Sequence, residues 1–164
     1  MAVEDKYIDA NIAAGKLGNP ALSQGAEVVA LTATFEVAAA DDNGSVYRIG
    51  TLNENLIPWS ITITNDAITG GTDYELGFYD VGVGGAAVDI DVLLGTTTMA
   101  SARAEGSGIS GLSAVGQSDA TKKIYELLGK TVVNKKAGYD LAVTANTVGT
   151  AAGTITVKGL FLKG

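Results

Sequence analysis

Two carboxylates in the sequence are spaced in a way that could support chemistry. Asp89 and Asp91 stand two residues apart in the run VDIDVLL, and strand-like alternation places both side chains on one face. Their Cα atoms would then lie roughly 6.5 Å apart, a spacing suited to acid–base catalysis or to a hard cation such as Ca²⁺. No neighbouring residue completes either kind of site. The pattern therefore favours a solvated strand face over a reaction centre.

The chain contains neither histidine nor cysteine. This excludes disulfides, thiolate zinc sites and cysteine nucleophiles. It also removes the commonest general base at neutral pH, so a serine nucleophile would need an unusual partner such as lysine. We therefore expect no enzymatic activity, no cofactor and no metal ion.

Two further motifs match ligand-binding loops only in part. The turn DDNGS alternates Asp41 and Asn43, but an EF-hand counted from Asp41 would need Gly and Glu where the chain has Val46 and Leu52. The run GVGGAA is glycine-rich, yet it lacks the Gly-Lys-Ser/Thr ending and the following helix of a phosphate-binding loop. DDNGS is therefore predicted to be a hairpin turn, and GVGGAA is predicted to be a turn.

Aromatic residues are the remaining candidates for binding, since they could stack against a sugar. Strand alternation groups Trp59, Tyr74 and Tyr139 with the inward residues, which predicts that they pack in the core. Tyr79 lies on the opposite strand face from Phe78 and is the aromatic side chain that we keep for an exposed contact.

Charge and hydropathy exclude several classes of partner. The 11 basic and 18 acidic residues give a net charge of −7, which lacks the electrostatic footprint of a nucleic-acid-binding protein. No apolar run is long enough to span a membrane, and the first residues, MAVEDKYIDAN, do not resemble a secretory signal. We expect neither nucleic acid nor membrane as a partner.

Short alternating segments separated by turns predict an all-β chain. The expected strands cover residues 28–38, 45–52, 57–64, 74–81, 88–94, 139–148 and 154–164, the last two paired antiparallel. Residues 122–130 fit either a helical turn or a strand, and residues 95–120 are predicted to form a long loop with at most one short strand. With 22 glycines and 2 prolines, this pattern favours an antiparallel two-sheet β-sandwich of jelly-roll or related Greek-key type.

The segment IPWSITIT has the most regular alternation in the chain. It places Ile57, Trp59, Ile61 and Ile63 on the inward face. Pro58 cannot donate a backbone hydrogen bond, so we expect this strand to begin at a sheet edge or at a bulge.

Residues 1–25 stand apart from the predicted sandwich domain of residues 26–164. Their apolar side chains follow no sustained period, and a short helix over residues 5–14 is one option. We interpret the segment as an extended arm that docks on a partner, with a strap across the protein's own sheet as an equal alternative. The predicted contact residues of this arm are Tyr7, Ile8, Ile12, Leu17 and Leu22.

The C-terminal segment TITVKGLFLKG carries apolar side chains on both faces. Ile155, Val157 and Phe161 share one face, whereas Leu160 and Leu162 lie on the other. One face can fill the core, and the second needs a cover. We predict that Leu160 and Leu162 belong to an interface in a small homo-oligomer, with a trimer slightly favoured over a dimer.

Three stretches resemble head decoration, or cement, proteins of tailed bacteriophages. They are GTLNENLIPWSITITNDAITGGTDYELGFYD, GGAAVDIDVLL and KAGYDLAVTANTVGTAAGTITVKGLFLKG, which together cover roughly Gly50 to the C-terminus. The resemblance implies a β-sandwich subunit made in the host cytoplasm and located on the outer surface of the capsid. There it would bind the major capsid protein and bridge neighbouring capsid subunits. The resemblance implies no catalytic residues.

Two other functions compete with this interpretation. A carbohydrate- or receptor-binding virion component would use exposed aromatic residues and the face that carries Asp89 and Asp91. A hydrolase is disfavoured by the missing histidine and the incomplete carboxylate sets.

The arm provides a first test. Deleting Met1 to Gln24 should leave a folded sandwich that binds capsids poorly, because an arm that orders on docking contributes its contacts to the partner. Circular dichroism and co-sedimentation with capsids measure the two properties separately. Unfolding of the truncated protein would show that the segment is an internal strap.

Overall fold

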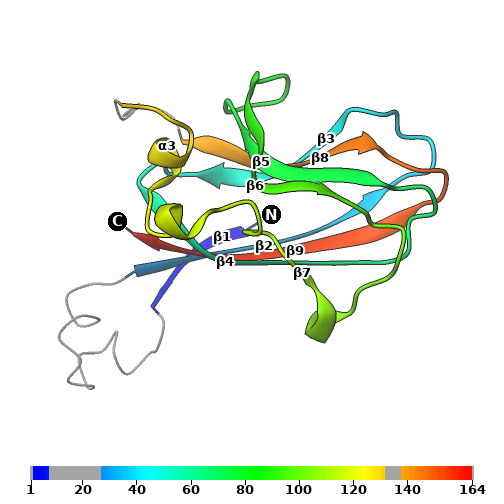
Figure 1. The fold of residues 1–164 in the computed structure, drawn as a ribbon, viewed down its shortest axis with the longest axis horizontal. Coiled ribbons are helices and arrows are strands. Elements are labelled where there is room, and N and C mark those ends of the chain that lie inside the picture. The colour runs from blue at the N-terminus through cyan, green and yellow to red at the C-terminus, as the bar shows by residue number, and fades with distance from the viewer. Residues whose placement is uncertain (1, 8–26, 132–137, 164) are drawn as a thin grey trace.

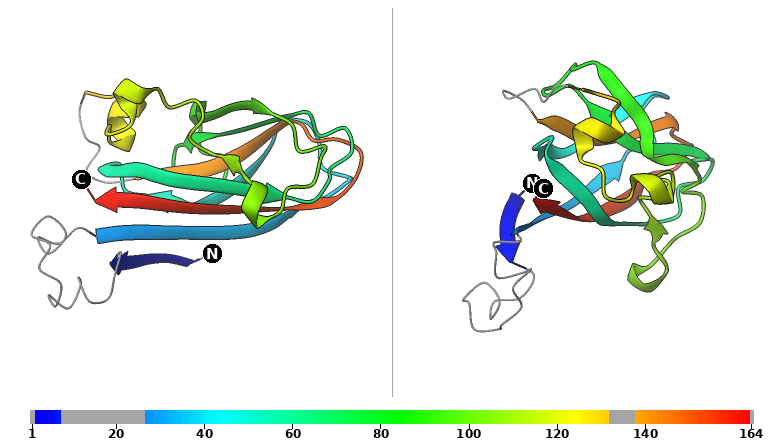
Figure 2. Two further views of the ribbon diagram at one scale, coloured as in Figure 1. Left: turned by 60° about the horizontal axis from the view of Figure 1, so that its bottom comes forward. Right: turned by 60° about the vertical axis from the view of Figure 1, so that its left-hand side comes forward.

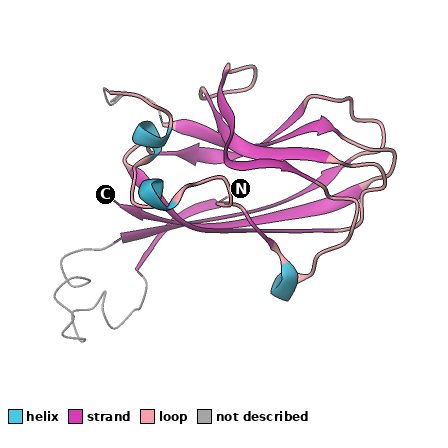
Figure 3. Ribbon diagram, viewed as in Figure 1, coloured by secondary structure: helices cyan, strands magenta, loops and turns pink. Residues whose placement is uncertain are grey.

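The computed structural model of the chain describes residues 2–7, 27–131 and 138–163. This part of the chain forms nine strands in two sheets that pack face to face, with very little helix (Figures 1 and 3). The strands are β1 (Ala2–Tyr7), β2 (Glu27–Val37), β3 (Ser45–Leu52), β4 (Leu56–Asn65), β5 (Asp73–Tyr79), β6 (Ala87–Thr97), β7 (Ile109–Ser110), β8 (Tyr139–Thr147) and β9 (Gly153–Lys163). The short helices are η1 (Glu105–Ser107), η2 (Gln117–Asp119) and α3 (Ile124–Leu127).

The strand order confirms the predicted antiparallel sandwich. One sheet has the order β1-β2-β9-β4-β7 and the other β3-β8-β5-β6, with antiparallel pairing throughout. From β3 onward, each strand lies in the opposite sheet from the one before it, except in the β5–β6 hairpin. This alternation between sheets fits the jelly-roll or related Greek-key type. The expected pairing of the last two strands is wrong, because β8 and β9 lie in different sheets.

The inner faces of the two sheets form one core. β9 contributes Ile155, Val157 and Phe161, all fully buried, and it is hydrogen-bonded to β2 on one edge and β4 on the other. Gly159 lies between Val157 and Phe161 on the same face of β9, and a Cβ there would come within 2.7 Å of the Phe161 ring. Fully burying a large apolar side chain contributes about 1.5–3 kcal/mol. The missing side chain at Gly159 therefore gives the Phe161 ring its place in the core.

A bulge in β4 changes which residues point inward. Pro58 pairs with Phe161 and is buried, whereas the next paired residue, Ser60, lies opposite Leu160 on the outer face. Trp59 is the extra residue between them, and it is 60% exposed. Of the two alternatives expected at Pro58, a sheet edge or a bulge, the bulge is confirmed. The expected inward positions of Ile57 and Trp59 are wrong, because the residues before the bulge alternate one position out of step with Ile61 and Ile63.

The predicted long loop, residues 95–120, has little regular structure, as expected. Its first three residues extend β6, and it contains the single short strand β7, which pairs with β4. Met99 is fully buried and anchors the segment to the core. Of the two alternatives for residues 122–130, the helical turn is confirmed as α3, which buries Ile124. The described residues contain no helix that is long and apolar enough to cross a membrane.

The first strand lies on the edge of the five-stranded sheet. β1 runs beside β2 from Ala2 opposite Thr32 to Tyr7 opposite Glu27 (Figure 2, left). Residues 5–7 are thus strand and not the beginning of a helix. Residues 8–26 lie outside the described part of the chain, so the docking role predicted for Ile8, Ile12, Leu17 and Leu22 stays a prediction.

Glycine at position 77 tests how tightly the β5–β6 hairpin is packed. A Cβ on Gly77 would lie 2.1 Å from the carbonyl oxygen of Asp89 and 2.4 Å from the carbonyl carbon of Ile90, both backbone atoms of β6. Gly77→Ala should lower the free energy of unfolding by about 1–3 kcal/mol through overpacking. Gly95→Ala is the matched control on β6, because a Cβ there has no atom within 4 Å. Chemical denaturation measures both variants, and an equal effect at the two positions would contradict the expected close packing.

Candidate contact surface

The outer face of the five-stranded sheet is polar over most of its length. Threonines dominate it, and the hydroxyls of Thr34 on β2 and Thr156 on β9 hydrogen-bond across the strands at 2.9 Å. The threonines that belong to this face are Thr32, Thr34, Thr62, Thr64, Thr154 and Thr156. β-branched residues with a hydroxyl suit a strand face that contacts water, so this region needs no partner.

One end of the same face is apolar. Near the end of β9, Leu160 is 44% exposed, beside Trp59 from the β4 bulge. Leu162 and Ile57 are half-buried and directly opposite each other, and Ala30 on β2 lies opposite Leu160. We call these five residues the outer-face patch. It is made by the middle three strands of the sheet, β2, β9 and β4, near the C-terminal end labelled in Figure 1.

The structure describes the backbone of three of the seven interface residues predicted from the sequence. Tyr7 ends β1 opposite Glu27 on this protein's own sheet, and its docking role stays a prediction. Leu160 and Leu162 share the outer face, opposite the buried Phe161, as expected. Leu160 is the more exposed of the two, because Leu162 is half-buried between Val28 and Ile57 in the neighbouring strands. Trp59 was missed as a surface residue. The signal that could have found it is Pro58, because a bulge at Pro58 reverses the alternation that follows.

The two carboxylates of β6 lie close together, but not on a fully solvated face. Asp91 is exposed and Asp89 is half-buried. Burial, followed by the hydrogen bond with the Asp91 carboxyl, raises the pKa of Asp89. Within the described residues, no three acidic side chains gather as they would around a metal ion. The pair is therefore a local electrostatic feature of the hairpin.

The DDNGS turn uses its polar side chains to stabilise itself. The Asp41 carboxylate accepts hydrogen bonds from the Tyr47 hydroxyl at 2.7 Å and from the Ala38 N–H at 2.9 Å. Asn43 Oδ1 accepts from the Val148 N–H at 3.1 Å. These contacts confirm a turn, but the expected hairpin is wrong, because the turn connects β2 and β3 in opposite sheets.

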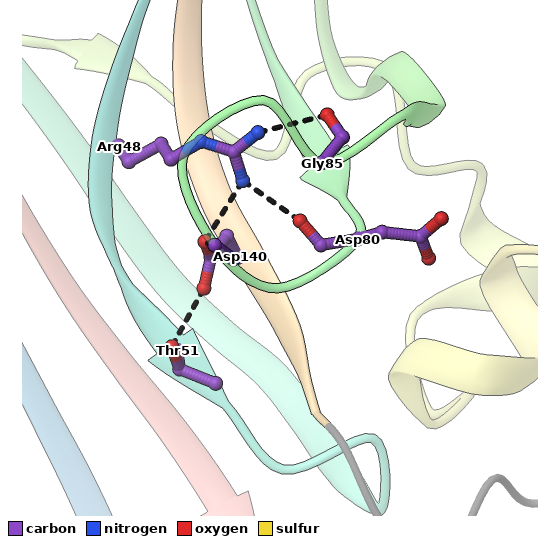
Figure 4. Close-up of polar contacts among 6 residues, drawn as sticks. Arg48, Thr51, Asp80, Gly85 and Asp140 are labelled. Carbon is purple, nitrogen blue, oxygen red and sulfur yellow. Dashed lines mark hydrogen bonds and ion pairs between the residues drawn. The ribbon is translucent and has the colours of Figure 1, made fainter.

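A polar network on the four-stranded sheet was not foreseen from the sequence (Figure 4). Arg48 on β3 forms an ion pair with Asp140 on β8, with 2.8 Å between Nη1 and Oδ2. The hydroxyl of Thr51 donates to the other Asp140 oxygen at 2.6 Å. Burial would raise the pKa of Asp140, but the hydrogen bonds that it accepts outweigh burial and hold this pKa below its usual value. Asp140 is therefore an anion at neutral pH.

The same network buries the tyrosine that we expected to be exposed. Tyr79 is only 6% exposed, and its hydroxyl hydrogen-bonds with that of Thr144 at 2.7 Å. The Arg48 guanidinium covers its ring, 5.1 Å from the centroid. The prediction for Tyr79 is wrong because this strand face is covered by side chains distant in sequence. Tyr74 and Tyr139 are buried, as predicted.

No known protein family and no curated protein matches the sequence. Two chains from solved structures are similar in fold. One belongs to the capsid of Ralstonia phage GP4; it is 16% identical with a TM-score of 0.57, and the match covers 84% of each chain. The other belongs to the capsid asymmetric unit of cyanophage Pam1; it is 13% identical with a TM-score of 0.48, over 85% of this chain and 86% of that one. At 16% identity, the first likeness establishes a shared fold.

The Asp89–Asp91 pair predicts a specific pH dependence. Because the folded-state pKa of Asp89 is raised, the folded protein takes up this proton more readily than the unfolded chain. Protonation of Asp89 therefore stabilises the folded protein. This stabilisation is fully present below the pKa of Asp89 in the unfolded chain, and it is lost as the pH rises through the pKa of Asp89 in the folded protein. Asp89→Asn should therefore raise the melting temperature at pH 7 by about 1–2 °C, with a smaller gain near pH 4.

Scanning calorimetry at both pH values measures the change in melting temperature. Asp91→Asn, which changes the exposed member of the pair, is measured beside Asp89→Asn. A Ca²⁺-dependent rise in the melting temperature of the parent protein, lost in the double variant, would contradict this assignment and indicate a cation site.

Proposed function

We propose that this chain is a structural virion protein that binds the outer surface of an assembled phage capsid. In this role it would stabilise the capsid by bridging neighbouring subunits of the major capsid protein. The observation that carries the proposal is the fold likeness to a chain of the Ralstonia phage GP4 capsid. The outer-face patch, in which Trp59 and Leu160 present large apolar side chains to solvent, supports an assembled state of the protein.

The proposed role needs contact area and no reaction. Exposed apolar surface that is contiguous on a folded domain commonly marks a protein–protein interface. An interface of about 800 Å² per partner is the usual size for specific recognition, and many copies on one particle gain further from multivalency. We accordingly assign no enzymatic activity and no cofactor to the chain.

We assign the outer-face patch to contacts between copies in a small cyclic oligomer. A trimer is slightly favoured over a dimer, as the sequence suggested. Burial between copies would remove Trp59 and Leu160 from water, each for a gain of about 1.5–3 kcal/mol. Such an oligomer would present several equivalent contacts to the capsid at once.

Replacing both exposed residues tests this assignment. Trp59→Ser with Leu160→Ser should shift the protein toward monomer while its β-sheet circular dichroism is preserved, since neither side chain is part of the core. Val46→Ser is the matched control, because Val46 is exposed on β3 in the other sheet. Analytical ultracentrifugation decides the outcome. If the parent protein is already monomeric at micromolar concentration, the oligomer assignment is wrong, and the outer-face patch would then be assigned to the capsid contact.

The exposure of Trp59 also favours a second candidate, a carbohydrate- or receptor-binding virion component. An indole ring on an open strand face is suited to stacking against a sugar. A glycan array probed with the parent protein and with Trp59→Ala separates the two functions. Binding that is lost in the variant would support the carbohydrate role, whereas capsid binding without glycan binding would support the structural one.

A further inference from the structure

The loop between β5 and β6 ends in an apolar tip. This β5–β6 loop comprises residues 80–86. Val83 is fully exposed and Val81 is 45% exposed, which is unusual for a loop tip, where polar residues are the rule. Gly82 and Gly84, on either side of Val83, have φ angles of 102° and 80°, a backbone conformation that favours glycine. The tip therefore displays two valines on a tightly turned backbone.

The base of this loop is clamped to the four-stranded sheet (Figure 4). Arg48 donates to the carbonyl of Asp80 at 2.8 Å and to that of Gly85 at 2.9 Å, while its ion pair holds Asp140. The Asp140 carboxylate in turn accepts the Gly82 N–H at 3.0 Å. A Cβ on Gly85 would lie 2.1 Å from the Asp80 carbonyl oxygen, so the two ends of the loop are in direct contact.

This clamp fixes the loop before any partner binds. Arg48 engages the carbonyls of Asp80 and Gly85 at the two ends of the loop, and Asp140 engages the Gly82 N–H between the two valines. None of these contacts involves a valine side chain. Ordering a loop during folding removes the entropic cost of ordering it on binding. A rigid loop with exposed valines is thus suited to insertion into a complementary pocket.

The hairpin that carries the tip is acidic. Asp80 and Asp91 are exposed and Asp89 is half-buried, and none of the three takes part in the ion pairs found among the described residues. Figure 4 shows the Asp80 carboxylate pointing away from Arg48. A second copy of a chain with a net charge of −7 is a poor match for this hairpin. The matching partner surface is an apolar pocket with a basic rim.

We propose that the β5–β6 loop is the element that inserts into an apolar, basic-rimmed pocket on the major capsid protein. This inference rests on the proposed function and adds a second contact to it. The hairpin projects from the four-stranded sheet, on the opposite side of the sandwich from the five-stranded sheet and its outer-face patch (Figures 1 and 2). One side of the subunit would then contact its own copies and the other side the shell.

Binding to capsid shells tests the inference. The probe is shells of the phage that encodes this chain, purified from particles that lack this protein. Val81→Ser with Val83→Ser should weaken binding at least about tenfold, whereas Val46→Ser on β3 should leave it unchanged. Val83→Ser alone is the second variant, since a fully exposed side chain can be replaced without disturbing the fold. Asp80→Asn with Asp91→Asn should reduce the salt dependence of binding.

The outcomes separate this inference from the proposed function. If the parent binds shells and both valine variants bind equally well, the loop assignment is overturned while the capsid role stands. If the parent does not bind shells, the capsid role fails and the loop assignment fails with it. If the valine variants change the sedimentation of the isolated protein and not its binding to shells, the loop contacts a second copy and the inference is overturned.

Discussion

The strand β9, hydrogen-bonded to β2 on one edge and to β4 on the other, organises the five-stranded sheet. Its inner face carries Ile155, Val157 and Phe161, and these apolar side chains are removed from water by packing against the other sheet. Phe161 lies over Gly159, a position without a side chain. The same arrangement leaves the outer side chains of β9 without cover from its own sheet, and Leu160 is the most exposed of its large apolar residues.

Because the chain changes sheet at nearly every connection, residues far apart in sequence become neighbours. Arg48 and Asp140 are separated by 92 positions, yet they lie on adjacent strands and share an ion pair. Their pairing has two consequences at once. It covers Tyr79 on a strand face that would otherwise be open to solvent, and it fixes the base of the β5–β6 loop. Removing either partner would leave a largely buried charge uncompensated, which is costly in a protein interior.

The exposed apolar side chains of the described residues gather on opposite sides of the sandwich. The outer-face patch spans three strands around the β4 bulge, whereas the exposed valines of the β5–β6 loop lie in the connection between two strands. A patch on a sheet face suits an interface between equivalent subunits, and a projecting loop suits a pocket on a different protein. The proposed bridging role requires two such distinct contacts.

The alternation of side chains and the turn residues were enough to predict the all-β class, the sandwich, a long loop with at most one short strand, and the shared face of Leu160 and Leu162. These features follow from patterns that act over a few positions. Pro58 predicted a sheet edge or a bulge, but not that Trp59 would point outward. The separation of β8 and β9 into different sheets, the cover over Tyr79 and the clamp that Arg48 places on a distant loop became visible only in the folded protein. Those features depend on contacts between residues that are far apart in the chain. No local pattern of side chains encodes which distant strand will pair with a given strand.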